Sequence, residues 1–95
     1  MVYVDTLRAT ARSANWRYDH SCHLFADTVE ELHEFAARLG MRRAWFQISR
    51  SGVAHYDLTA GRRRDALRLG AKEATRDDLR RLITRKADND TPEVA

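Results

Sequence analysis

Apolar residues follow two spacings along this chain, and each spacing predicts a different kind of element. Short runs rich in β-branched and aromatic residues predict strands, whereas an apolar stripe that repeats every three to four residues predicts a helix. The strand-like runs, the third of which also suits a packed loop, lie at 2–4, 23–26, 45–48, 53–56 and 72–74. The helix-like stretches lie at 28–39, 59–69 and 75–86.

The helix at 28–39 has the clearest local signals. Thr28 and Glu31 form a capping-box pattern, in which a hydroxyl and a carboxylate satisfy the first backbone N–H groups. Gly40 stands where a left-handed residue commonly ends a helix. The apolar stripe between these signals consists of Val29, Leu32, Phe35, Ala36 and Leu39. The helix at 75–86 begins with a similar pattern, in which Asp78 takes the place of the glutamate.

The order of these elements predicts a small α/β or α+β fold. We expect a three- to four-stranded sheet with about three helices packed on it. A chain of 95 residues with 43% hydrophobic residues can form one globular domain. We expect that domain to span 1–86 and the acidic segment 87–95 to be a flexible tail.

The compartment is also constrained by composition. Cys22 is the only cysteine, which excludes an intramolecular disulfide and suits a reducing environment. The chain has neither a signal-peptide pattern nor an apolar run long enough to span a bilayer. These features predict a cytoplasmic protein without a membrane partner.

Positive charge is concentrated in segment 62–86. It holds ten basic and four acidic residues, whereas the net charge of the chain is only +3. Arginines spaced four apart on a helix lie side by side, and their planar guanidinium groups suit phosphate. We therefore expect a surface for an anionic partner, most simply a nucleic acid. Its candidate residues are Arg63, Arg64, Arg68, Arg76, Arg80 and Arg81. The alternative is a solvated face with ion pairs to neighbouring aspartates.

Acidic residues stand at the ends of three predicted strands. If the strands are parallel, Asp5, Asp27 and Asp57 converge at one sheet edge, with His55 close by. Such carboxylates could bind a divalent cation that activates water against a phosphodiester. This second hypothesis is a metal-dependent phosphoesterase or nuclease. The alternative is that Asp27 and Asp57 are helix N-caps and Asp5 holds a turn.

A binding protein is favoured over an enzyme, and no cofactor or metal is expected. If an ion binds nevertheless, its candidate ligands are Asp5, His23, Asp27 and Asp57. The run His20-x-Cys22-His23 has zinc-ligand residue types but lacks a second ligand pair, so Cys22 is better explained as a small buried residue.

Several short motifs together resemble a known family. They lie at 3–5, 23–27, 31–36, 39–40, 45–47, 55–58 and 70–71. Over residues 2–83 the chain is similar to a family of small bacterial and bacteriophage proteins catalogued as a domain of unknown function. The resemblance implies one compact domain and no assigned activity, cofactor or partner. It draws attention to the polar positions within the motifs: Asp5, His23, Asp27, His33, His55, Tyr56 and Asp57.

A third hypothesis is a protein-interaction module, such as a phage protein that docks a host protein. Trp45 and Phe46 would be its anchors if their rings are exposed. Association with a second copy, as a homodimer, is a further expectation.

Overall fold

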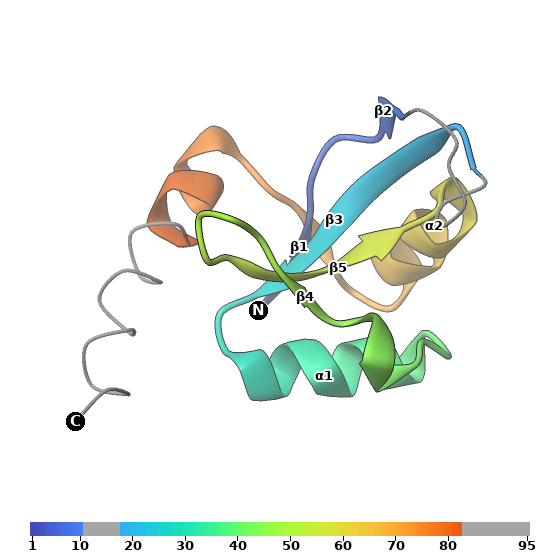
Figure 1. Ribbon diagram of the computed structural model, residues 1–95, viewed down its shortest axis with the longest axis horizontal. Helices are drawn as coiled ribbons and strands as arrows, with labels where there is room; N and C mark the ends of the chain where they lie inside the picture. Colours follow the sequence, from blue (N-terminus) through green and yellow to red (C-terminus); the bar gives the residue numbers. More distant parts are fainter. Residues whose placement is uncertain (11–17, 83–95) are drawn as a thin grey trace.

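A mixed sheet forms the centre of the computed structural model, which describes residues 1–10 and 18–82 (Figure 1). The strands are β1 (Val2–Val4), β2 (Arg8–Ala9), β3 (His20–Ala26), β4 (Gln47–Ile48), β5 (Ala54–Leu58) and β6 (Lys72–Glu73). The helices are α1 (Val29–Arg38), α2 (Ala60–Arg68), a short 3-10 turn η1 (Arg43–Trp45) and a helix over 76–82. The α+β fold with three helices is thus confirmed, and the sheet has more strands than expected because three of them are only two residues long.

The strand order is β4-β5-β3-β1-β6, with β2 paired to β3 off this path. β3 is antiparallel to both β1 and β5, whereas β1 and β6 are parallel. β1 and β5 therefore point in one direction and β3 points in the other. The carboxyl ends of β1 and β5 therefore lie on one side of the sheet, at the edge formed by the strand ends, and the carboxyl end of β3 lies at the opposite edge. This arrangement overturns the expectation that the aspartates following all three strands converge.

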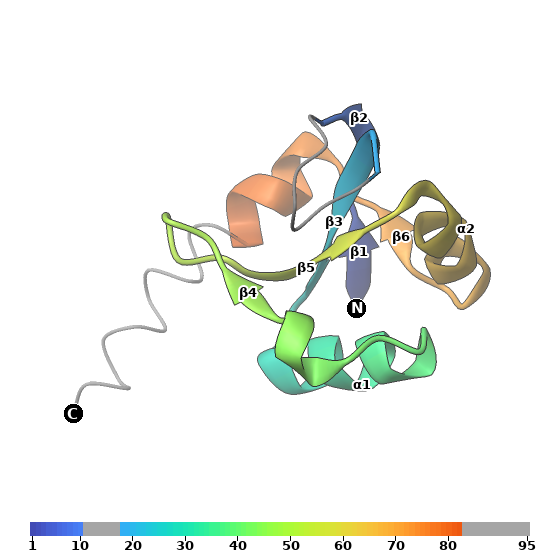
Figure 2. The same ribbon diagram turned by 45° about the vertical axis from the view of Figure 1, so that its right-hand side comes forward.

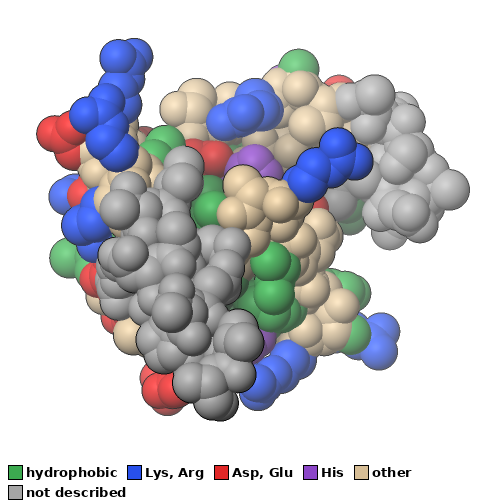
Figure 3. Space-filling view, turned by 60° about the vertical axis from the view of Figure 1, so that its left-hand side comes forward, with side chains coloured by type: hydrophobic (Ala, Val, Ile, Leu, Met, Phe, Trp, Pro, Cys, Tyr) green, Lys and Arg blue, Asp and Glu red, His purple; other side chains and the backbone are tan. Residues whose placement is uncertain are grey.

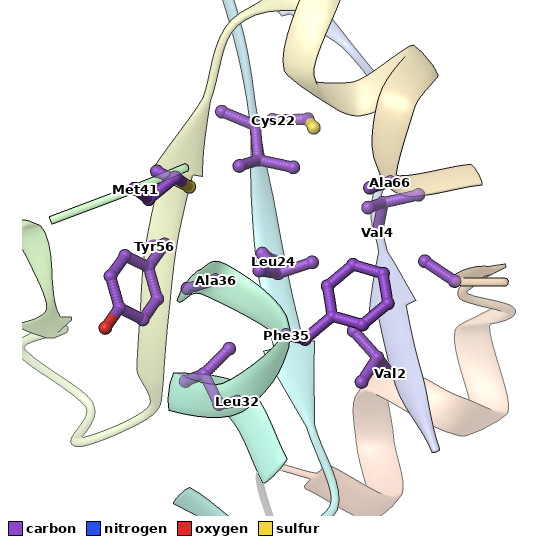
Figure 4. Packing of buried hydrophobic residues seen from close by; sticks show 12 residues of the cluster. Val2, Val4, Cys22, Leu24, Leu32, Phe35, Ala36, Met41, Tyr56 and Ala66 are labelled. Atoms are coloured by element: carbon purple, nitrogen blue, oxygen red, sulfur yellow. The ribbon is translucent and has the colours of Figure 1, made fainter. Parts of the chain in front are cut away.

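One face of the sheet packs against α1 and α2 and forms the core. Successive residues of a strand point to opposite faces, so alternate positions of β1, β3 and β5 supply this face. The contributing strand residues are Val2, Val4, Cys22, Leu24, Tyr56 and Leu58. α1 adds Leu32, Phe35 and Ala36, and α2 adds Ala66 (Figure 4). Figure 2 shows α1 lying along one side of the strands with α2 beside their far end.

The opposite face, here called the outer face, carries the other residues of the same strands. They include Tyr3 of β1, His23 and Phe25 of β3, and His55 and Asp57 of β5. The helix over 76–82 reaches this side, because Arg81 donates to the hydroxyl of Tyr3. Figure 1 shows this helix and α1 on opposite sides of the strands.

Threonine side chains begin all three helices. The hydroxyl of Thr28 accepts from the N–H of Glu31, and Thr59 accepts from the N–H of Arg62. Thr75 and Asp78 form the full reciprocal capping box. The expectation that aspartates cap α1 and α2 is therefore wrong. Asp27 precedes the cap of α1, while β5 extends to Leu58 and takes Asp57 into the strand.

Helix ends follow the expected glycine signal. α1 ends before Gly40, whose φ of 77° lies in the left-handed region that disfavours residues with a Cβ atom. Gly70, with φ of 108°, follows α2 in the same way. The end of the last helix beyond residue 82 and the expected tail at 87–95 lie outside the described residues. Within 1–10 and 18–82, no helix is both long and apolar enough to cross a membrane.

Candidate metal centre on the outer face of the sheet

Four polar residues that lie in or directly after three neighbouring strands meet on the outer face: Asp5, His23, His55 and Asp57. His23 of β3 is the register partner of Asp57 of β5, so their side chains lie next to each other. His55 stands two residues before Asp57 in the same strand and therefore points to the same side. Asp5 follows β1, and its backbone N–H continues the ladder to the carbonyl of His23 at 3.2 Å. The sheet thus places two imidazoles and two carboxylates within contact distance.

The ligand atoms of His23, His55 and Asp57 all lie within 4.8 Å of one another. Oδ1 of Asp57 is 3.7 Å from Nε2 of His23 and 3.6 Å from Nε2 of His55. Ligands bound at about 2.1 Å to a common tetrahedral ion stand about 3.4 Å apart. The two distances to Asp57 are therefore close to the spacing that one divalent ion requires, and the third pair lies within 4.8 Å.

Each of these three residues is held through its other polar atom. Nδ1 of His55 donates to the carbonyl of Val53 at 3.0 Å, which leaves Nε2 as the lone-pair atom of the neutral ring. Nδ1 of His23 lies 2.7 Å from Oδ2 of Asp5. Nε2 of Gln47 donates to Oδ2 of Asp57 at 3.0 Å. Partners of this kind orient metal ligands, and an acceptor opposite a histidine N–H also raises the basicity of that ring.

Asp5 is the most constrained member of the cluster. Its carboxylate is only 6% exposed and accepts from both the backbone N–H and the ring of His23. Burial alone would raise the pKa of Asp5, but the hydrogen bonds from His23 outweigh burial and lower it. The same pair raises the pKa of His23, against the opposing effect of burial. Asp5 is thus an ionised partner that fixes the orientation of the His23 ring.

The centre is accessible from solvent on one side. His23 is 33% exposed and Asp57 is 29% exposed, whereas His55 is buried. The rings of His23 and His55 meet edge to face, with centroids 5.0 Å apart. Figure 3 shows a histidine side chain at the surface, with acidic and basic side chains beside it. Two of the three candidate ligands are therefore partly open to solvent.

Asp27 lies outside this cluster, contrary to the convergence hypothesis. It follows β3 and so stands at the opposite edge of the sheet. Its carboxylate is 2.9 Å from the guanidinium of Arg81 and 3.3 Å from the amino group of Met1. Burial opposes these contacts, which nevertheless lower the pKa of Asp27. Asp27 therefore ties the last helix and the first residue to the end of β3.

The run from His20 to His23 forms no zinc group among the described residues. Cys22 points into the core and is 1% exposed, whereas its neighbour His23 points to the outer face. Burial raises the pKa of the Cys22 thiol to about 12, so it is protonated at neutral pH and is no nucleophile. Nδ1 of His33 lies 2.7 Å from the hydroxyl of Tyr56, on the side of the sheet that faces α1.

The predicted anion-binding arginines fall into two groups. Nε of Arg63 donates to the carbonyl of Asp5, and its NH2 group donates to Glu73. Arg81 binds Asp27, Asp78 and the hydroxyl of Tyr3. These two side chains thus hold elements together. Arg81 is nevertheless 43% exposed, and the other four arginines are exposed as well: Arg64, Arg68, Arg76 and Arg80.

The two proposed anchors of a protein interface also differ. Trp45 is 42% exposed, and the guanidinium of Arg62 lies 5.7 Å from its ring. Phe46 is half-buried and packs its ring against His33 and Tyr56. Only Trp45 meets the condition of exposure that the docking hypothesis sets.

Sequence reasoning missed two residues around the centre, Arg8 and Gln47. Arg8 stands in a two-residue strand that is too short to leave a periodic signal. Gln47 lies in the predicted run 45–48, but nothing in the sequence linked its amide to Asp57. The spacing of His55 and Asp57 suits one face of a strand, but the predicted strand ended at Tyr56 and left Asp57 outside it. The alignment of His23 with Asp57 depends on strand register, for which the sequence carried no signal.

Comparison with known proteins gives one positive result. Residues 2–86 match the family described as "Protein of unknown function (DUF4031)", which confirms the resemblance to an uncharacterised domain family. No curated protein and no solved structure matches this chain. The matched range takes in all four residues of the cluster, from Asp5 to Asp57. Because the match covers nearly the whole sequence, the chain belongs to the DUF4031 family of proteins of unknown function.

Proposed function

We propose that this protein is a metal-dependent phosphoesterase whose divalent ion is held by His23, His55 and Asp57. The observation that carries the proposal is the paired arrangement of ligand atoms and supporting groups. Each of the three residues directs one polar atom toward the others, while its second polar atom is engaged by Asp5, Val53 or Gln47. Supporting contacts of this kind are typical of metal ligands.

The ligand set suits a catalytic ion better than a structural one. Structural zinc sites usually have four protein ligands, whereas catalytic sites have three and leave a position for water or substrate. Two imidazoles and one carboxylate match the preferences of zinc, manganese, cobalt and ferrous ions. The partial exposure of His23 and Asp57 leaves such a position open to solvent.

Hydrolysis is the reaction class that needs least beyond this centre. An ion bound here would lower the pKa of a coordinated water and so provide a nucleophile near neutral pH. Attack on a phosphoester forms one P–O bond to the water oxygen and breaks the P–O bond to the leaving alcohol. The proton lost by water ends on that alcohol, so no oxidant or reductant is required. The net charge of +3 favours an anionic substrate of this type.

The test of this proposal is a Co²⁺ titration of the purified protein, followed by visible absorption. The wild type should develop the bands of a four- or five-coordinate ion, and His23→Ala should abolish them. His20→Ala is the matched control, because His20 is an exposed histidine of the same strand whose described partner is Asp19. Circular dichroism should show an unchanged fold in both variants.

The same samples should then be assayed for hydrolysis of bis(p-nitrophenyl) phosphate with Mn²⁺, Zn²⁺ or Co²⁺. Activity that requires the ion and disappears in His23→Ala supports the proposal. Co²⁺ bands that persist in His23→Ala would overturn the assignment of the ligands. A bound ion without hydrolysis of the phosphoester would support the metal site but exclude the proposed activity.

Nucleic-acid binding is a second candidate function, favoured by the exposed arginines of α2 and the last helix. Arg64, Arg68 and Arg76 are exposed, and the described partner of Arg68 is Asp65 at 3.8 Å. Neutralised phosphates release counterions, so binding should weaken steeply with salt. Fluorescence anisotropy of labelled oligonucleotides should detect this dependence and its reduction in Arg64→Gln. Affinity that does not change with salt would exclude this function.

A further inference from the structure

An arginine side chain, that of Arg8, lies beside the proposed metal centre, on a strand that the sequence did not predict. Arg8 belongs to β2, and its register partner in β3 is Ser21. Partners in an antiparallel pair point to the same face, and Ser21 lies two residues before His23. The side chain of Arg8 is therefore directed to the outer face, on the same side as the metal-ligand atoms.

One contact connects Arg8 to the centre. Its NH2 group lies 3.5 Å from Oδ2 of Asp5, the same oxygen that contacts the ring of His23. The guanidinium is thus separated from a proposed ligand by a single carboxylate. The side chain is nevertheless 59% exposed, so this contact leaves much of the planar group facing solvent. A guanidinium has five N–H donors, far more than one long contact engages.

We propose that Arg8 binds a non-bridging phosphate oxygen of the substrate, and this inference rests on the proposed function. Phosphoryl-transfer sites commonly combine a metal ion with a guanidinium, which together neutralise the oxygens of the phosphate. Arginine suits this role because its fork matches two phosphate oxygens at once.

Arg63 also approaches Asp5 but does not fit the same role. Its Nε donates to the carbonyl of Asp5 and its NH2 group to Glu73, and the side chain is only 19% exposed. Arg63 therefore attaches α2 and β6 to the end of β1. Arg8 combines proximity to the centre with exposure, which is the combination that recognition of a ligand requires.

A purely structural role for Arg8 would have a different signature. If Arg8 served only to hold Asp5, its removal would disturb the orientation of His23 and lower the affinity for the metal ion. If Arg8 binds substrate, its removal should leave the affinity for the metal ion unchanged and lower the affinity for phosphate. The two quantities can be measured separately, with inorganic phosphate as the probe.

The experiment is a phosphate titration of the Co²⁺-loaded protein, followed by the change in visible absorption. Arg8→Gln should bind Co²⁺ within threefold of the wild type and bind phosphate at least tenfold more weakly. Arg8→Lys, which keeps the charge but loses the fork, should fall between the two. The control is Arg38→Gln, an exposed arginine on α1 at the opposite side of the sheet. It should bind both ligands as the wild type does.

Three results would overturn the inference, and they differ in what they say about the metal centre. Phosphate affinity that is unchanged in Arg8→Gln, with Co²⁺ bound normally, would remove the substrate role and leave the centre intact. Loss of Co²⁺ in Arg8→Gln would show that Arg8 acts through Asp5. A wild type that binds no Co²⁺ would overturn the proposed function and this inference together.

Discussion

The two faces of the central strands are built from alternate residues of the same short segments, and their chemistry is opposite. In β3, Cys22 and Leu24 enter the apolar core, while His23 between them joins a polar cluster. In β5, Tyr56 and Leu58 are buried, while His55 and Asp57 point to the outer face. The comparison teaches that a strand can stabilise a domain with one set of residues and keep the other set for chemistry.

Chemical access to Cys22 tests the contrast most sharply. Burial raises the pKa of its thiol to about 12, so the reactive thiolate is scarce. Relative to an ordinary cysteine, iodoacetamide at pH 8 should react roughly a thousandfold more slowly with the native protein. Mass spectrometry of native and urea-unfolded samples measures this ratio. Equal alkylation rates in both states would mean that Cys22 is not buried on this face of β3.

The next test compares adjacent residues on opposite faces. Leu24 is fully buried, so Leu24→Ala should lower the free energy of unfolding by about 3 kcal/mol. His23→Ala should lower it less, since His23 is partly exposed, while removing metal binding. Urea unfolding followed by circular dichroism gives both values. A larger loss in His23→Ala would reverse the division of roles.

Within the outer face, Asp5 should act through His23. Asp5→Asn keeps the shape of the side chain and removes the charge that orients the ring. Metal affinity should fall about tenfold to a hundredfold, as is usual for partners of metal ligands. Isothermal titration with Zn²⁺ measures the change, and Asp27→Asn is the control because Asp27 lies at the other edge. Equal losses in both variants would contradict the assignment.

The smallest effect concerns the capping box of the last helix, which borders the outer face. Hydrogen bonds from Thr75 lower the pKa of Asp78 to about 2, from 3.8. A lowered pKa means stabilisation that is present above pH 3.8 and is lost as the pH falls through about 2. The Tm difference between wild type and Asp78→Asn should therefore narrow between pH 4 and pH 2. A difference that stays constant over this range would exclude an ionised cap.

Local features of the fold were predictable from the sequence. The Thr28 cap of α1 and the Thr75–Asp78 capping box were identified from spacings of three residues, as was the stripe of α1 with Leu32 and Phe35. The glycine that follows α1 was identified in the same way. Such signals depend on residues within one or two helical turns, so the sequence contains them directly. The segment of β1 was located with its observed bounds, and those of β3 and β5 were located with ends shifted by one to three residues.

The candidate site was predictable only in part. Asp5, His55 and Asp57 were among the expected residues, and His23 was among the possible metal ligands. Asp27 was included because a parallel sheet would bring it to the others. The antiparallel pairing of β3 moves it to the far edge, where it binds Arg81. The arginine surface was likewise only partly predictable, since Arg63 and Arg81 join elements that are distant in sequence.

The sequence by itself determined the helices, the caps at Thr28 and Thr75, and the segments that become β1, β3 and β5, because these depend on interactions between near neighbours. It placed His55 and Asp57 two residues apart, but the predicted strand ended at Tyr56, so only the observed length of β5 puts both residues on one face. Only the tertiary structure decided which carboxylates join them. Strand direction and register follow from contacts between segments far apart in the chain, and a reversed strand moves its last residue to the opposite edge.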